Sequence, residues 1–142
     1  MRLNMQDFAG WKNASAPTLG VFEALAASAW ERLPGDFRQL CGDVVIRVED
    51  FAPEDVLEGL EIEDAFDLMG LYQGVSLDKK SVSDQASEPD MVFLYRRPIL
   101  DYWADGEETL GDIVSHVLIH EIGHHFGFSD EDMEAIESEV TA

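Results

Sequence analysis

The chain is 142 residues long and carries 30 acidic residues against 9 basic ones, which gives a formal net charge of −21. That charge argues against nucleic acid and anionic membrane surfaces as partners, because both bind proteins through clustered Lys and Arg. The length and the 46% hydrophobic fraction predict one compact domain over residues 1–142. Repulsion between such acidic molecules favours a monomer, and attraction of cationic peptides is an open alternative role for the charge.

Cysteine usage and hydropathy bear on the compartment. Cys41 is the only cysteine, so no internal disulfide can form and a reducing compartment is indicated. We expect its thiol to be buried as a small apolar group. The N-terminus has no apolar signal region, and no apolar run approaches the roughly 20 residues that span a bilayer. The sequence therefore predicts a cytoplasmic protein.

The first part of the chain is predicted to be helical. Residues 1–14 lack periodicity and are expected to form a flexible arm. A helix is predicted over 17–33, where apolar residues recur at spacings of three and four, and Pro34 ends it. A short helical turn is expected to follow before Gly42.

The middle of the chain reads as strands. A β-branched run predicts a strand over 43–50, and Pro53 is expected to open a short helix. A second strand is predicted over 66–77, with Gly70 and Gly74 as bulges. We expect this strand to offer an edge to an extended peptide.

The remaining elements complete an α+β pattern. Residues 79–90 are polar and predict a mobile surface loop, and 91–97 predicts a third strand. A long helix is expected over 110–126, and a shorter one opening at Ser129 or Asp130. Few strands and no βαβ alternation predict an α+β fold with several helices besides the long one.

The long helix carries the chemistry. His120 and His124 are four residues apart, so on a helix they lie one above the other and can hold one zinc ion. Glu121 lies about 100° around the helix from His120, beside the metal rather than in line with the two ligands. The helical wheel places Glu121 inside an apolar arc, where partial burial raises the pKa of a carboxylate towards that of a useful base.

The residues after the second histidine allow a third ligand. Gly127 suits the end of the helix, where a left-handed backbone turns the chain back. Asp130 follows, giving the pattern H-E-x-x-H-x-x-G-x-x-D. From spacing alone, Asp130 is either a metal ligand or a first-turn acid that stabilises the last helix through its dipole.

Three neighbours have alternative interpretations. His125 lies on the apolar arc, so we expect a hydrogen-bonded core histidine rather than a ligand. His116, one turn before His120, is either a fourth donor or a polar residue at the rim of the site. Met133 is expected to be a core methionine. The oxyanion-stabilising residue is left open among Tyr72, Tyr95 and Tyr102.

With these residues, the sequence resembles the small bacterial zincin-like metallopeptidases. The resemblance runs from about Pro17 to Glu137 and is carried by HEIGHHFG at 120–127 with Ser129-Asp130, supported by GLYQGV at 70–75 and YRRPI at 95–99. It implies a minimal, metzincin-like arrangement in which Asp130 is the third metal ligand. It also implies a small mixed sheet packed on the active-site helix.

The function expected from these residues is zinc-dependent hydrolysis of a peptide or protein substrate. Zn²⁺ held by His120, His124 and Asp130 would lower the pKa of a bound water, and Glu121 would act as the general base. The main alternative is a metal-binding interaction or regulatory module without significant peptidase activity. A weaker alternative, an acidic mimic of nucleic acid, rests on the charge alone.

Overall fold

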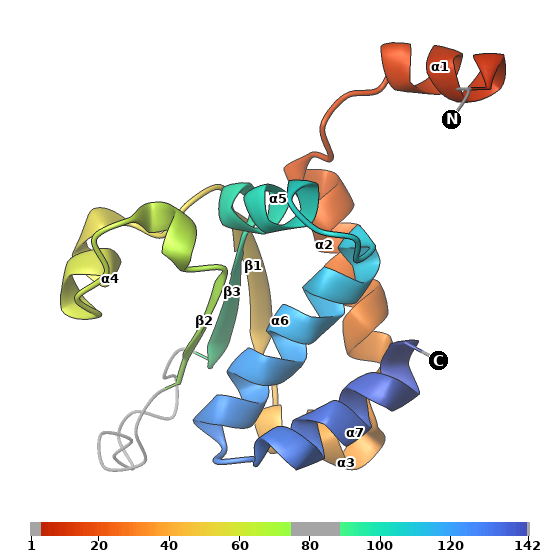
Figure 1. Ribbon diagram of the computed structural model, residues 1–142. Helices are drawn as coiled ribbons and strands as arrows, with labels where there is room; N and C mark the ends of the chain where they lie inside the picture. Colours follow the sequence, from red (N-terminus) through yellow and green to blue (C-terminus); the bar gives the residue numbers. More distant parts are fainter. Residues whose placement is uncertain (1–3, 75–88, 142) are drawn as a thin grey trace.

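Three short strands and a set of helices make up this α+β protein, as the computed structural model shows (Figure 1). The structure describes residues 4–74 and 89–141. Their order and bounds are α1 (Met5–Lys12), α2 (Leu19–Arg32), α3 (Gly35–Cys41), β1 (Val45–Glu49), α4 (Glu54–Gly59), the 3₁₀ helix η1 (Ala65–Asp67), β2 (Gly70–Gln73), β3 (Met91–Tyr95), α5 (Arg96–Ala104), α6 (Leu110–His125) and α7 (Asp130–Thr141).

The sheet is mixed, with strand order β1-β3-β2. β1 runs parallel to β3, with Val45 opposite Met91, and β2 runs antiparallel to β3, with Gly70 opposite Leu94. β3 is therefore the central strand, and β2 lies at one edge of the sheet. This confirms the small mixed sheet that the family resemblance implies.

The two longest helices begin at side-chain caps. Thr18 Oγ1 accepts a hydrogen bond from the Val21 N–H at 3.2 Å, and Thr109 Oγ1 accepts one from the Asp112 N–H at 3.2 Å. Each threonine satisfies a backbone donor that the first helical turn leaves free. The helix predicted over 17–33 thus begins two residues later, at Leu19.

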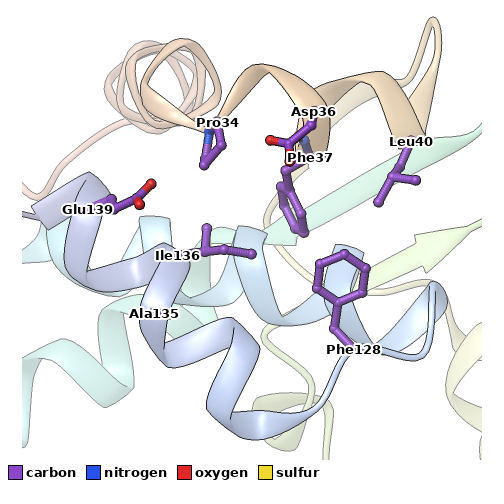
Figure 2. A pocket seen from close by; sticks show the side chains of 8 residues that line it. All are labelled: Pro34, Asp36, Phe37, Leu40, Phe128, Ala135, Ile136 and Glu139. Carbon is purple, nitrogen blue, oxygen red and sulfur yellow. Dashed lines mark hydrogen bonds between the residues drawn. The ribbon is translucent and has the colours of Figure 1, made fainter.

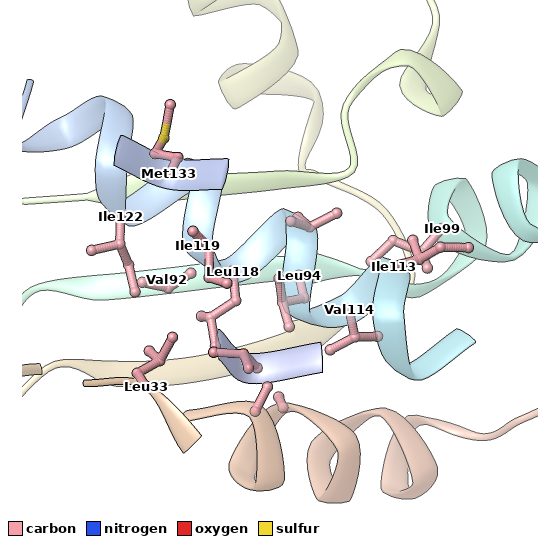
Figure 3. Close-up of a cluster of buried hydrophobic side chains, with 14 of the residues drawn as sticks. Leu33, Val92, Leu94, Ile99, Ile113, Val114, Leu118, Ile119, Ile122 and Met133 are labelled. Atoms are coloured by element: carbon pink, nitrogen blue, oxygen red, sulfur yellow. The ribbon is translucent and has the colours of Figure 1, made fainter. Parts of the chain in front are cut away.

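The core lies around α6, which contacts α2, α7 and the sheet. Its apolar side chains are buried between the sheet and α2, and Figure 3 shows them together with Leu33 and Met133. The fully buried members are Phe22, Val92, Leu94, Ile99, Val114, Leu118, Ile119, Ile122 and Met133. Cys41 is also buried, as expected, and burial raises the pKa of its thiol to about 11.

Several predicted bounds need correction. The strand expected over 66–77 spans only Gly70–Gln73, because Ala65–Asp67 forms a 3₁₀ turn that Asp64 caps. Residues 75–77 and most of the loop expected over 79–90 lie outside the described residues. Gly70 is paired in register with Leu94, so it is not a bulge.

The strand expected over 91–97 ends at Tyr95, where α5 follows directly. Pro98 is the third residue of α5, a first-turn position whose missing N–H costs no hydrogen bond. This helix was not predicted from the sequence, because α5 begins directly after β3 with no residue between them.

Within the arm expected over 1–14, residues 5–12 form the helix α1. In Figure 1, α1 lies away from the other elements, and its large apolar side chains Met5, Phe8 and Trp11 are exposed. None of the described helices combines the length and apolarity needed to cross a membrane.

Candidate metal centre on α6

Three histidines form a row along one face of α6. His116, His120 and His124 are each separated by four residues. The rings of His120 and His124 lie 5.7 Å apart with an angle of 81° between their planes, whereas those of His116 and His120 are stacked at 3.9 Å and 25°. The expected placement of His120 beside His124 is therefore confirmed, and His116 extends the row by one turn.

The donor atoms of this row suit a metal ion. With Zn–N distances of about 2 Å, two imidazoles on one zinc ion have ring centres about 5 to 6 Å apart, close to the His120–His124 spacing. Burial is the largest cause that lowers the pKa of His120, followed by the neighbouring His116, and both favour the neutral imidazole that metals bind. Within the described part of the chain, His120 Nε2 is buried without a hydrogen-bond partner. A bound metal would satisfy this nitrogen.

Glu137 of α7 faces the N-terminal half of the histidine row. His116 Nδ1 lies 2.8 Å from Glu137 Oε1 and 3.0 Å from Oε2. His120 Nε2 lies 3.6 Å from Glu137 Oε2, too far for a hydrogen bond. Among the residues that the structure describes, these three form the group of metal-ligating side chains whose donor atoms all lie within 4.8 Å of one another.

Glu121 lies on the side of α6 that faces the edge strand. A Cβ atom at Gly70 of β2 would lie 3.2 Å from Glu121 Cγ and 2.6 Å from Val117 Cγ1. Gly70 is therefore required for the close approach of β2 to α6. Burial raises the pKa of Glu121, while the nearby His124 acts in the opposite direction. The partly desolvated carboxylate expected from the helical wheel is thus confirmed.

A tight turn connects α6 to α7. Gly127 has φ +76°, which an L-residue rarely adopts, and the Phe128 N–H donates to the Gly123 carbonyl at 2.8 Å. Ser129 Oγ then accepts from the Asp132 N–H at 3.1 Å and caps α7. The predicted glycine turn and the start of the last helix are confirmed.

Asp130 is the first residue of α7 and is exposed. The metal-ligating group described above contains neither Asp130 nor His124, and ligation by these two residues stays a prediction. Glu137 was not predicted from the sequence. The sequence feature that could have identified it is its spacing of seven residues from Asp130, which places both carboxylates on the same face of α7.

His125 is not the core histidine that we expected. Its side chain is exposed and stacks on Tyr72 of β2, with ring centres 4.0 Å apart. The apolar arc does not continue to this position because α6 ends there, beside Gly74 at the end of the edge strand. Met133, in contrast, is fully buried, as predicted.

The three candidate tyrosines have different surroundings. The Tyr72 hydroxyl donates to Asp90 Oδ2 at 2.8 Å, and the Tyr102 hydroxyl donates to Glu108 Oε1 at 3.0 Å. Tyr95 is only 1% exposed, and burial raises its pKa to about 12. Of the three, Tyr72 lies beside the C-terminal end of α6, through its contact with His125.

A separate groove lies between α3 and α7 (Figure 2). It has a volume of about 410 Å³ and is largely apolar, and Phe37 and Phe128, which line it, are in edge-to-face contact. Ile136 and Glu139 of α7 line it, whereas Glu137 of the same helix points to the histidines. The groove and the histidine row therefore use different faces of α7.

Comparison with known proteins identifies the family of the chain. The sequence profile of a family described as zincin-like metallopeptidase matches residues 41–140, most of the chain, and the chain belongs to that family. The match begins at Cys41, later than the expected Pro17, and includes α6 and nearly all of α7. A comparison with curated proteins finds no match. Membership of the family implies a bound metal, which the donor set of α6 fits.

Proposed function

We propose that this member of the zincin-like metallopeptidase family is a zinc-dependent peptidase. In this proposal His120, His124 and Asp130 hold the zinc ion and Glu121 is the general base. The observation that carries the proposal is the position of Glu121, next to His120 in the chain, partly buried against Gly70, and with a raised pKa. A structural zinc site needs no such base.

Glu121 performs the proton transfers. Its carboxylate accepts a proton from the attacking water and later donates it to the amine nitrogen that leaves the cleaved peptide bond. The partial burial that raises its pKa brings its basicity closer to neutral pH. A bound zinc ion supplies Lewis-acid polarisation of the peptide carbonyl and makes water more acidic.

The edge strand β2 binds the substrate backbone in this proposal. β2 pairs with β3 along one side only, among the described residues, so its other side can hydrogen-bond to an extended peptide. Glu121 contacts this strand at Gly70, which brings the base and the substrate-binding edge together. Tyr72, on the same strand, is the tyrosine best placed to stabilise an oxyanion.

A second candidate function is metal binding without hydrolysis. The group His116, His120 and Glu137 favours it, because added protein ligands close the coordination position that water needs. Such a protein would be an interaction or regulatory module stabilised by metal.

The test is the variant Glu121→Gln, which keeps the size of the side chain and removes the base. We expect it to retain zinc and to lose most hydrolysis of any library peptide that the zinc-loaded wild type cleaves, by about 10² to 10⁴ in rate. Zinc content is measured by elemental analysis, and Glu131→Gln, an exposed change on α7, is the matched control.

The outcomes separate the roles. His120→Ala combined with His124→Ala should abolish zinc binding, and equal zinc content in that variant would contradict the site. Loss of zinc in Glu121→Gln would show that Glu121 is a ligand. Unchanged hydrolysis in Glu121→Gln would show that the activity does not depend on this base.

A further inference from the structure

We infer that His116, His120 and Glu137 form a second metal position, one helical turn N-terminal to the His120–His124 pair. Because both positions use His120, a metal at the second position competes with the catalytic one. The second position stands on its own geometry, whereas its regulatory effect rests on the proposed peptidase function.

The distances between the donor atoms fit a shared ion. Ligand atoms around a tetrahedral zinc ion, each about 2 Å from the metal, are about 3.4 Å apart. Here Glu137 Oε2 lies 3.0 Å from His116 Nδ1 and 3.6 Å from His120 Nε2. One carboxylate oxygen thus lies near a nitrogen of each imidazole. A metal there would give a ligand role to the buried His120 Nε2, which lacks a hydrogen bond within the described chain.

The packing of α7 on α6 builds this arrangement. Figure 1 shows α7 running back along α6 after the turn at Gly127. Met133 fits against Gly123, where a Cβ atom would lie 2.3 Å from the Met133 sulfur, so no larger residue allows this approach. Glu137 is one turn beyond Met133, and His120 is nearly one turn before Gly123. The close contact therefore sets Glu137 opposite His120 and His116.

The donor set selects the class of metal. Two imidazole nitrogens and one carboxylate oxygen suit Zn²⁺ and related divalent transition metals, whereas Ca²⁺ and Mg²⁺ prefer oxygen ligands. In the metal-free protein, His116 Nδ1 lies 2.8 Å from Glu137 Oε1, so a proton on this nitrogen is donated to the carboxylate. Metal binding moves that proton to Nε2 through solvent, which reaches the imidazole because its side chain is 45% exposed. The stacked rings of His116 and His120 must rotate apart to direct both lone pairs at one ion.

Competition follows from the shared histidine. The lone pair of His120 Nε2 can bind one ion, so an ion held by His116 and Glu137 removes this nitrogen from the pair with His124. We therefore expect about one zinc per chain at saturation rather than two. A metal at the second position holds the peptidase in an inactive form.

The experiment measures binding of Zn²⁺ and of Co²⁺, whose absorption spectrum reports its ligands, to the full chain. In the variant that combines His124→Ala with Asp130→Ala, the second position is intact, and about one metal per chain should remain. Adding Glu137→Gln to this variant should weaken the affinity at least tenfold and change the Co²⁺ spectrum. Adding Glu139→Gln, a change on the groove side of α7, should do neither.

Three results would overturn the inference. The first is complete loss of metal in the His124→Ala, Asp130→Ala variant while its circular dichroism matches the wild type. The second is equal affinity of the Glu137→Gln and Glu139→Gln versions. The third, two zinc ions per wild-type chain, removes the competition. Absence of peptide hydrolysis by the wild type contradicts the proposed function alone and leaves the binding result standing.

Discussion

The contact between Gly123 of α6 and Met133 of α7 leads to a stability prediction that does not depend on activity. A Cβ atom at position 123 would lie 2.3 Å from the Met133 sulfur and 2.7 Å from its Cγ. Ordinary contacts between such atoms are about 3.5 to 4 Å. Gly123→Ala therefore forces the fully buried Met133 to move, or forces α7 away from α6.

Two opposing effects set the size of the change. Alanine in a helix is favoured over glycine by up to about 1 kcal/mol, and overpacking a core costs typically about 1 to 3 kcal/mol. We expect Gly123→Ala to lower the free energy of unfolding by about 1 to 2 kcal/mol. Gly111→Ala, in the same helix, is the matched control, because its Cβ atom meets only Leu25, at an ordinary 3.9 Å. It should be neutral or stabilising.

Urea unfolding of the metal-free variants measures the difference. A double-mutant cycle with Met133→Ala tests the cause, because removing the sulfur removes the clash. In the Met133→Ala background, Gly123→Ala should no longer destabilise, although Met133→Ala itself costs about 2 to 5 kcal/mol. If Gly123→Ala destabilises equally in both backgrounds, or stabilises as much as Gly111→Ala, the proposed close contact is wrong.

Two further predictions concern the site. In a Glu137→Gln background, which removes the second metal position, Asp130→Ala should weaken zinc affinity at least tenfold and Asp132→Ala should not, since a dipole contact contributes under about 1 kcal/mol. Equal affinities by competition with a chelating dye would leave Asp130 as a first-turn acid of α7 only. In metal-free protein, Glu121→Gln should raise the free energy of unfolding at pH 7.5 but not below pH 4.5, the ordinary pKa of a glutamate. Burial raises the pKa of Glu121 in the folded state, so it destabilises the fold only when the carboxylate is ionised. Denaturant unfolding at pH 7.5 and pH 4 measures this, with the exposed Glu58→Gln as control, and an equal gain at both pH values would exclude burial of the charge as the cause.

Elements with strong local signals could be predicted from the sequence. The apolar spacing of α2 and α6, the β-branched run of β1 and the glycine after α6 each act within a few residues, so the pattern was sufficient. The order of the strands could not be predicted, because pairing depends on contacts between distant segments. The helix α5 was missed for a local reason, since no turn residue separates it from β3.

Some residues of the site could likewise be predicted from the sequence, and others could not. His120 and Glu121 follow from helical geometry alone, and the structure confirms the ring spacing and the burial that the helical wheel implied. The contribution of Glu137 depends on how α7 crosses α6, which a single helix does not reveal. The prediction for His125 was wrong because a helical wheel does not show where along the helix axis the core ends. His125 lies in the last turn of α6, beyond the core.

The strand order has a consequence for how the chain folds. The central strand β3 comes last of the three in the sequence, and β1 and β2 both hydrogen-bond to it rather than to each other. No part of the native sheet can therefore form on a ribosome before Met91 has emerged. Until then β1 and β2 both lack their pairing partner. The sheet therefore depends on contacts between segments distant in sequence, and such contacts slow folding. The apolar helix α6 emerges after α5 and packs between the sheet and α2.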